Sequence, residues 1–420
     1  MAARRVAATR RRHRTTLAAP LPARTGVSIL TMVSAISRRA LLGGVLGGSA
    51  YAALAGSPFA RAQDAGLAAA RPRRLIVRST RPENLETPTD LLDADFTPND
   101  VFFVRSHFGP PIVDPRTFRL DVSGLCDRPL SLSLDELRKF PEVTVPAVLQ
   151  CSGNGRALFR PRIAGAQWER GAVGQARWTG VRLADVLRHV GANPGARFVR
   201  LLGADRAPMP TVPEFARSVP LDKAMHPMTI LAYGMNGEPL PILHGAPLRL
   251  VVPAWAGDHW VKWLRSIRLD AAEDAGFYMK TAYRMPRTPV VPGGSVKPED
   301  TDPLTGMIVK ALITSPADSQ VLGSERVAVT GVAFAGEDDV KRVDVSVDGG
   351  KSYLAATLDP PRGLGAWQRW RFLWRPKPGT YRLLARATDT KGRTQPDVPT
   401  WNPSGYLWNA PDAITCEVRA

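Results

Sequence analysis

The chain has 420 residues, of which 44% are hydrophobic and 22% charged, with a formal net charge of +18. This composition excludes an intrinsically disordered chain, and the length exceeds what one hydrophobic core usually fills, so two or three domains are expected. The 38 prolines and 36 glycines favour strands, turns and loops over a helical bundle.

The first 62 residues are predicted to be an export signal. They hold ten arginines and no acidic residue, so the rest of the chain carries a net charge of only +8. "SRRALLGG" at 37–44 places two arginines before an uncharged Leu-, Ala- and Gly-rich stretch, and "ARA" at 60–62 offers a cleavage site. This pattern is typical of a twin-arginine signal, which exports folded proteins that carry a cofactor. We therefore expect a periplasmic protein without a membrane span. Met32 is an alternative start, and a mitochondrial presequence is the alternative interpretation.

Residues 63–94 are polar and basic, and we interpret them as an N-terminal arm. Between residues 95 and 285 short strands and helices alternate, which predicts an α+β domain with a mixed sheet. Its first elements are a strand at 117–125 and a helix at 133–141, where Ser133 and Glu136 have the spacing of a capping box. Further elements are predicted at 181–191 (a helix) and at 197–203, 228–234 and 247–253 (strands).

The C-terminal part has a different sequence pattern. Residues 286–305 are rich in proline and lack periodicity, so they are interpreted as a linker. Residues 306–420 contain alternating strands joined by turns, and Asp348-Gly349-Gly350 is a strong hairpin signal. This pattern predicts a β-sandwich of immunoglobulin-like size.

One of the three cysteines has a distinctive setting. Cys151 in "LQCSGNGR" follows an apolar run and precedes a Gly-rich turn in which the backbone can approach a bulky ligand. Arg156 favours the thiolate, which is a ligand for soft metals. The chain has no CxxC or HExxH motif, which disfavours zinc and iron–sulfur sites. A buried cysteine that only fills the core is the alternative.

Basic residues recur in three other segments. "VFFVRSHFGPP" places Arg105 and His107 on one face of an extended segment, "LHGAPLR" places His244 and Arg249 around a turn, and "GDHWVKWL" adds Lys262. Such groups suit a phosphate or another oxyanion, whereas a solvated basic surface is the alternative.

Taken together, these motifs resemble the sulfite oxidase family of molybdopterin enzymes. The strings "FFVRSH", "LQCSGNGR", "LLGAD", "HGAPLR" and "VKWL" follow that family in order and spacing, over residues 80–420. The similarity is greatest to periplasmic bacterial sulfite dehydrogenases that lack a haem domain, and no CxxCH motif occurs in this sequence. The resemblance implies a molybdenum-cofactor domain followed by an immunoglobulin-like dimerisation domain. One departure is "GDHW", where many relatives have a Gly-Ala-Arg run.

The resemblance also implies roles for individual residues. Cys151 would be the single protein ligand of molybdenum, and Arg105, His107, Arg156 and Tyr283 would join it as catalytic residues around the oxyanion. The residues implied to hold the molybdopterin are Phe103, Val104, Arg105, Ser106, His107, Cys151, Asp205, His244, Arg249, Trp260, Val261 and Lys262.

The implied reaction is the oxidation of sulfite to sulfate by a homodimer, with electrons passed to a c-type cytochrome. We expect neither nucleic acid nor a membrane among its partners. Two alternatives remain. One is a sulfane dehydrogenase or another oxyanion oxidoreductase of the same family, and the other is a non-enzymatic binding module for an acidic partner.

Overall fold

The computed structural model describes residues 75–420, so the predicted export signal and residues 63–74 lie outside the described part. Strands dominate this part, and its α-helices are short. The helices are α3 (Leu134–Leu137), α4 (Leu183–His189), α5 (Leu221–Ala224) and α6 (Phe277–Lys280). No helix between residues 75 and 420 has the length and apolar character needed to cross a membrane.

The two helices predicted from the sequence are confirmed. At the start of α3, the Ser133 side chain accepts a hydrogen bond from the Glu136 N–H, and the Glu136 carboxylate accepts one from the Ser133 N–H, which completes the capping box. Helix α4 buries Leu183 and Leu187 and ends before Gly191, whose φ of +69° suits a glycine stop.

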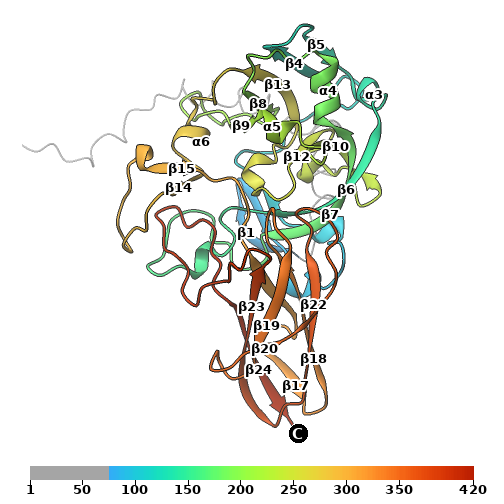
Figure 1. Ribbon diagram of the computed structural model, residues 1–420. Helices are drawn as coiled ribbons and strands as arrows, with labels where there is room; N and C mark the ends of the chain where they lie inside the picture. Colours follow the sequence, from blue (N-terminus) through green and yellow to red (C-terminus); the bar gives the residue numbers. More distant parts are fainter. Residues whose placement is uncertain (1–74) are drawn as a thin grey trace, which may run out of the picture. The chain divides into compact units, whose positions relative to one another are not determined.

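A mixed sheet and an antiparallel sheet form the first domain, which confirms the α+β prediction (Figure 1). The mixed sheet has the order β5-β4-β13-β8-β9, in which only β4 and β13 run parallel. Its strands are β4 (Leu120–Gly124), β5 (Leu130–Leu132), β8 (Phe198–Gly203), β9 (Ala216–Pro220) and β13 (Leu264–Asp270). Apolar side chains of both sheets share one core, in which Trp168 and Trp178 are fully buried.

The antiparallel sheet carries the cysteine motif at the end of one strand. Its order is β11-β10-β7-β6, and β12 also pairs with β10. Its strands are β6 (Glu142–Gln150), β7 (Val173–Arg182), β10 (Ile230–Met235), β11 (Glu238–Pro239) and β12 (Arg249–Val251). Cys151 follows the last residue of β6, and Arg249 is the first residue of β12. The sheet therefore fixes the backbone of two of the predicted site residues.

The start of the described chain differs from the predicted polar arm, because it forms strands. Strands β1 (Ile76–Thr80), β2 (Glu83–Glu86) and β3 (Val104–Arg105) form a three-stranded antiparallel sheet. Leu75 and Leu85 are buried beside Val104. The interpretation as a polar arm is therefore wrong for residues 75–86, where β1 and β2 pair with each other and β2 also pairs with β3 inside the next predicted domain.

The C-terminal domain is a sandwich of two sheets, as predicted (Figure 1). One sheet contains β16 (Lys310–Ser315), β18 (Val327–Phe334), β21 (Thr357–Leu358) and β22 (Gln368–Trp374). The other contains β17 (Gln320–Gly323), β19 (Val340–Ser346), β20 (Leu354–Ala355), β23 (Gly379–Asp389) and β24 (Asp412–Arg419). Their inner faces share a core that includes Trp370, Leu383 and Ile414.

The two ends of the segment between the domains pair with each other. Strands β14 (Arg284–Pro286) and β15 (Thr301–Pro303) pair antiparallel, so this linker returns to the point at which it starts. The Leu304 N–H also donates to the carbonyl of Tyr283 at 2.8 Å. The linker therefore helps to place a predicted catalytic tyrosine.

Polar contacts join the two domains. Arg170 forms an ion pair with Asp412 at 2.5 Å, and the Gln175 side chain accepts a hydrogen bond from the Trp367 N–H at 2.7 Å. Residues 402–408 of the C-terminal domain lie against the loop that carries Cys151. The Leu407 N–H donates to the carbonyl of Ser152 at 2.9 Å.

Candidate active site

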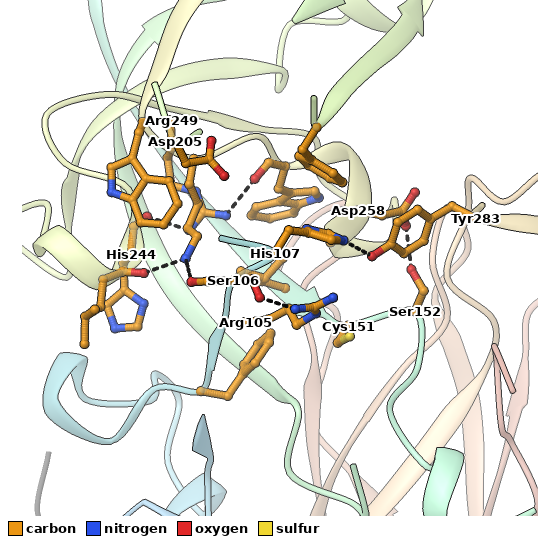
Figure 2. Close-up of a pocket in the computed structure, with 18 residues that line it drawn as sticks. Arg105, Ser106, His107, Cys151, Ser152, Asp205, His244, Arg249, Asp258 and Tyr283 are labelled. Carbon is orange, nitrogen blue, oxygen red and sulfur yellow. Dashed lines mark hydrogen bonds between the residues drawn. The ribbon is translucent and has the colours of Figure 1, made fainter. Parts of the chain in front are cut away.

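A cavity collects the predicted site residues from separate parts of the chain (Figure 2). An adjoining outer pocket shares Arg105, His107, Cys151 and Tyr283 with it and adds Arg156. The predicted residues that line the cavity are Phe103, Arg105, Ser106, His107, Cys151, Asp205, His244, Arg249, Trp260, Lys262 and Tyr283.

Two predicted residues do not reach the cavity with their side chains. Val104 packs in a small cluster with Leu85, and Val261 packs in the core of the first domain. Each sits between two lining residues in the sequence, so its side chain points the other way. Their side chains therefore do not contribute to the cavity wall, and a role in binding the cofactor through their backbone stays a prediction.

The loop after β6 places Cys151 in the cavity wall, where it can meet a ligand. The Cys151 N–H donates to the carbonyl of Ala172 at 2.9 Å, and its carbonyl accepts from the Asn154 N–H at 2.9 Å. Gly155 has a φ of +96°, and a Cβ there would lie 2.7 Å from Trp408. Glycine is thus required where this loop meets the C-terminal domain.

The state of the thiol differs from the sequence-based expectation. Burial raises the pKa of Cys151, although the charges of Arg105 and Arg156 act in the opposite direction. The expectation that Arg156 would favour a thiolate is therefore outweighed by desolvation. The thiol must lose its proton when it binds a metal.

Two arginines face the outer pocket beside this thiol. Arg156 is nearly buried, and it donates to the carbonyls of Ser404 and Ala166 at 3.0 and 3.2 Å. Arg105 donates to the Asn84 side chain at 3.2 Å and to the carbonyl of Ser106. Their recorded hydrogen bonds go to neutral oxygens, so both positive charges remain available to an anion.

A neutral hydrogen-bonded pair completes the outer pocket. The His107 Nε2 and the Tyr283 hydroxyl lie 2.7 Å apart (Figure 2). Burial, followed by the charge of Arg105, lowers the pKa of His107 well below its usual value, and burial raises the pKa of Tyr283. Both groups are therefore neutral near pH 7, and together they can donate and accept hydrogen bonds without adding charge.

The inner part of the cavity holds two deeply buried cations. Lys262 Nζ donates to Ser106 Oγ and to the carbonyl of Leu243, both at 2.9 Å. Arg249 donates to the carbonyls of His244 and Trp260 at 2.8 and 3.2 Å. The partners in these bonds are again neutral, so the inner cavity carries a positive potential.

The pKa values of these inner groups reflect the cost of removing their charged forms from water. Burial lowers the pKa of Arg249 to about 9 and that of His244 to about 3, and it also lowers the pKa of Lys262 well below its usual value. Burial raises the pKa of Asp205 to about 6 against the opposing charge of Lys262. An anionic ligand beside Lys262 and Arg249 would offset part of the cost of burying their charges.

Other residues at the site were not predicted from the sequence. Asp258, within the unusual "GDHW" string, accepts hydrogen bonds from Ser152 and from Arg217 at 2.5 and 2.7 Å. Tyr406 of the C-terminal domain stacks on Tyr283 with ring centres 5.4 Å apart. The departure of "GDHW" from its relatives was a signal for Asp258, whereas no local pattern connects Tyr406 to a site more than 100 residues away.

The comparisons with known proteins identify both domains. Residues 107–278 match the family described as the oxidoreductase molybdopterin binding domain, and residues 302–411 match the Mo-co oxidoreductase dimerisation domain. Sulfite oxidase of Arabidopsis thaliana is 34% identical over 359 residues, which cover 79% of this chain and 91% of the plant protein. The chain belongs to the sulfite oxidase family. The family is one of oxidoreductases, which disfavours the alternative of a binding module.

Two further relatives place the chain within this family. Mitochondrial sulfite oxidase of Homo sapiens is 38% identical over 354 residues, and the match spans 80% of this chain but only 64% of the human protein. The sulfane dehydrogenase SoxCD from Paracoccus pantotrophus has a structure that matches with a TM-score of 0.70 and 27% identity, over 81% of this chain and 88% of that chain. Sulfite oxidase-like and sulfane dehydrogenase-like proteins thus both occur among its relatives.

The family implies a molybdenum–molybdopterin cofactor, and the residues of the cavity fit it. Among residues 75–420, no group of three or more His, Cys, Asp or Glu side chains could hold a metal ion, so a metal here needs ligands from outside the protein. Cys151 offers one sulfur, and a dithiolene supplies sulfur ligands of the same soft kind. The buried Lys262 and Arg249, whose hydrogen bonds go to neutral oxygens, suit the negative charge of a pterin phosphate.

Proposed function

We propose that this protein oxidises sulfite to sulfate and passes the electrons to a c-type cytochrome. The observation that supports this proposal is the meeting of one half-buried thiol, two arginines without acidic partners, and a neutral His–Tyr pair around the same pocket. The cavity inside this pocket is cationic and matches a family cofactor that carries out two-electron chemistry.

The residues divide into those that hold the cofactor and those that handle the substrate. Cys151 would bind the molybdenum, while Lys262 and Arg249 would bind the anionic end of the pterin. The bound cofactor supplies the redox chemistry and the oxygen transfer. The chain itself supplies the charge and shape that place a small anion beside it.

The outer pocket explains how sulfite would be bound. Arg105 and Arg156 attract the dianion, and their fixed hydrogen bonds keep their charges in place while the substrate turns over. Because His107 and Tyr283 are neutral, they add hydrogen bonds without repelling either the arginines or the anion. The aromatic rings of Tyr406 and Tyr278 narrow the pocket and limit the water around the substrate.

The test of this proposal begins with Cys151→Ser. We expect the purified wild-type protein to contain about one molybdenum per chain and to reduce cytochrome c when sulfite is added. Cys151→Ser should abolish this reduction, because serine removes the only thiol in the cavity wall. Cys126→Ser is the matched control, since Cys126 lies outside the cavity. Undiminished activity of Cys151→Ser would refute the assignment.

A second candidate substrate is sulfane sulfur bound to a carrier, and the structural similarity to the SoxCD sulfane dehydrogenase supports it. The two candidates differ in what must enter the outer pocket. Turnover of free sulfite by the purified protein, without accessory proteins, supports sulfite as the substrate. Turnover only with a sulfur-bearing carrier protein supports the sulfane candidate.

We further propose that the protein works in the periplasm as a homodimer. The twin-arginine pattern at 37–44 supports export, and the match to a dimerisation domain supports the dimer. Cell fractionation with and without Arg38→Lys and Arg39→Lys tests export. Light scattering of the holoprotein tests the dimer, and a single chain in solution would contradict it.

A further inference from the structure

A fully engaged carboxylate lies in the wall of the cavity, between Cys151 and Tyr283. One oxygen of Asp258 accepts from Ser152 Oγ at 2.5 Å (Figure 2). The other accepts from Arg217 Nη2 at 2.7 Å. The side chains of Asp258 and Arg217 are 1% and 0% exposed. Because both carboxylate oxygens already have partners, Asp258 is poorly placed to accept a proton from a substrate.

The neighbouring His259 contacts both members of this ion pair and adds no charge to it. Its Nδ1 lies 3.1 Å from Asp258, and its Nε2 lies 3.0 Å from Arg217 Nη2. Arginine has only donors, so Nε2 must accept and Nδ1–H must donate to the carboxylate. His259 is therefore the neutral tautomer, and the cluster of Asp258, Arg217 and His259 has no net charge.

Arg217 connects this cluster to the other side of the pocket. Its Nη1 donates to the carbonyl of Tyr278, and its guanidinium lies 5.3 Å from the centre of the Tyr283 ring. Tyr283 itself has a φ of +55°, which a residue with a side chain seldom adopts. Such a backbone conformation persists only where surrounding contacts hold it.

The contacts therefore form a continuous path. They begin at Ser152, which is bonded to Cys151, pass through Asp258 and Arg217, and end at the face of Tyr283. A buried ion pair of this kind adds little net stability compared with apolar side chains of the same volume. The ion pair at this place therefore calls for another explanation, namely that it positions the groups around it.

We propose that the Asp258–Arg217 ion pair is a positioning device, which fixes the Tyr283 hydroxyl relative to the Cys151 sulfur. Ser152 anchors the pair to the cysteine loop, and Arg217 holds the tyrosine ring and the Tyr278 carbonyl. Neither Asp258 nor Arg217 reacts. They act through Tyr283, whose hydroxyl is already hydrogen-bonded to His107.

The first test is a double-mutant cycle with Asp258→Asn and Tyr283→Phe in the holoprotein, and its assay rests on the proposed sulfite oxidation. Asp258→Asn should lower kcat/KM for sulfite by about 10- to 100-fold, which is the usual effect of removing such a supporting partner. In the Tyr283→Phe background the same substitution should have less than about a twofold effect, because no hydroxyl remains to be positioned.

The matched control is Asp412→Asn, which breaks a buried Arg–Asp pair of similar geometry outside the site. It should lower thermal stability but have the same effect on kcat/KM with either residue at position 283. If Asp258→Asn behaves like this control, with the same fold loss in both backgrounds, the positioning role is wrong.

The second test is a crystal structure of the molybdenum-loaded variant, which does not depend on any substrate. In Asp258→Asn the Tyr283 ring should move by about 1 Å or more and lose its bond to His107, a shift large enough to account for the loss in rate. If this variant does not fold, Ser152→Ala removes only the anchor and should produce the same movement. An unmoved tyrosine overturns the proposal. Absence of sulfite turnover in the wild type refutes the proposed function and leaves this structural test intact.

Discussion

The inner cavity and the outer pocket are both cationic, but they are built in different ways. In the inner cavity, Lys262 and Arg249 come from one domain and are held by hydrogen bonds within it. In the outer pocket, Arg156 lies between the domains, with one bond to Ala166 and another to Ser404 of the C-terminal domain. The difference indicates that the first domain alone can shape the cofactor site, whereas the substrate pocket needs both.

Arg156 shows how closely the second domain is involved. Its guanidinium lies 5.3 Å from the centre of the Tyr406 ring, and a Cβ added at Gly405 would lie 2.8 Å from its side chain. The C-terminal domain therefore closes one wall of the outer pocket.

The largest expected effect tests the inner cavity. Lys262→Met should reduce the molybdenum content of the purified protein by about tenfold or more, because a buried charge-assisted hydrogen bond to the cofactor is lost. Metal analysis measures this content. Lys139→Met, at an exposed lysine of the same domain, should leave it unchanged. Full molybdenum content in Lys262→Met would show that the inner cation does not hold the cofactor.

The next effect concerns the buried carboxyl of Asp205 in the same region and the pH dependence of the protein's stability. In cofactor-free protein the pKa of Asp205 is raised to about 6 from 3.8, so the unfolded chain ionises first as the pH rises. Stability should therefore fall between about pH 4 and pH 6.5 relative to Asp205→Asn, by a total of about 3 kcal/mol. Urea unfolding of both proteins across this range measures the difference. Parallel pH curves for the two proteins would contradict this account.

A smaller effect tests the charge of the outer pocket. Arg156→Gln should lower kcat/KM for sulfite by about 10- to 100-fold, corresponding to about 1.5–3 kcal/mol for a lost hydrogen bond to a charged group. Most of the change should be in KM, with normal molybdenum content. Arg160→Gln alters an exposed arginine four residues away and serves as the control. Equal losses in both variants would point to damage of the loop instead.

The smallest effect tests the wall contributed by the C-terminal domain. Tyr406→Leu removes a ring stacked on Tyr283 and should lower kcat by about two- to tenfold, because an aromatic pair is worth about 0.5–1.5 kcal/mol beyond its buried area. Tyr353→Leu, on the same domain but outside both pockets, should leave steady-state sulfite kinetics unchanged. No change in Tyr406→Leu would mean that the first domain positions Tyr283 without help.

Local sequence patterns were sufficient to predict many elements of the fold. The capping box of α3 and the apolar face of α4 depend on contacts within a few residues, and both appear as predicted. The same is true of the hairpin at Asp348-Gly349-Gly350, which lies between β19 and β20. The segment from Leu75 to Glu86 was not predicted as strands, although β1 and β2 pair with each other as a local hairpin; only the pairing of β2 with β3 joins distant segments.

For the site, ordered motifs along the chain already name the chemical groups, namely one thiol, several cations, a histidine and a tyrosine. Their charge states and their neighbours follow from how the chain folds. Burial keeps the Cys151 thiol protonated against two arginines, and it turns Val104 and Val261 away from the cavity. It also brings Tyr406 to Tyr283 and Asp258 to Arg217. Desolvation and contacts between distant segments depend on how the whole chain packs, and a linear pattern does not contain that information.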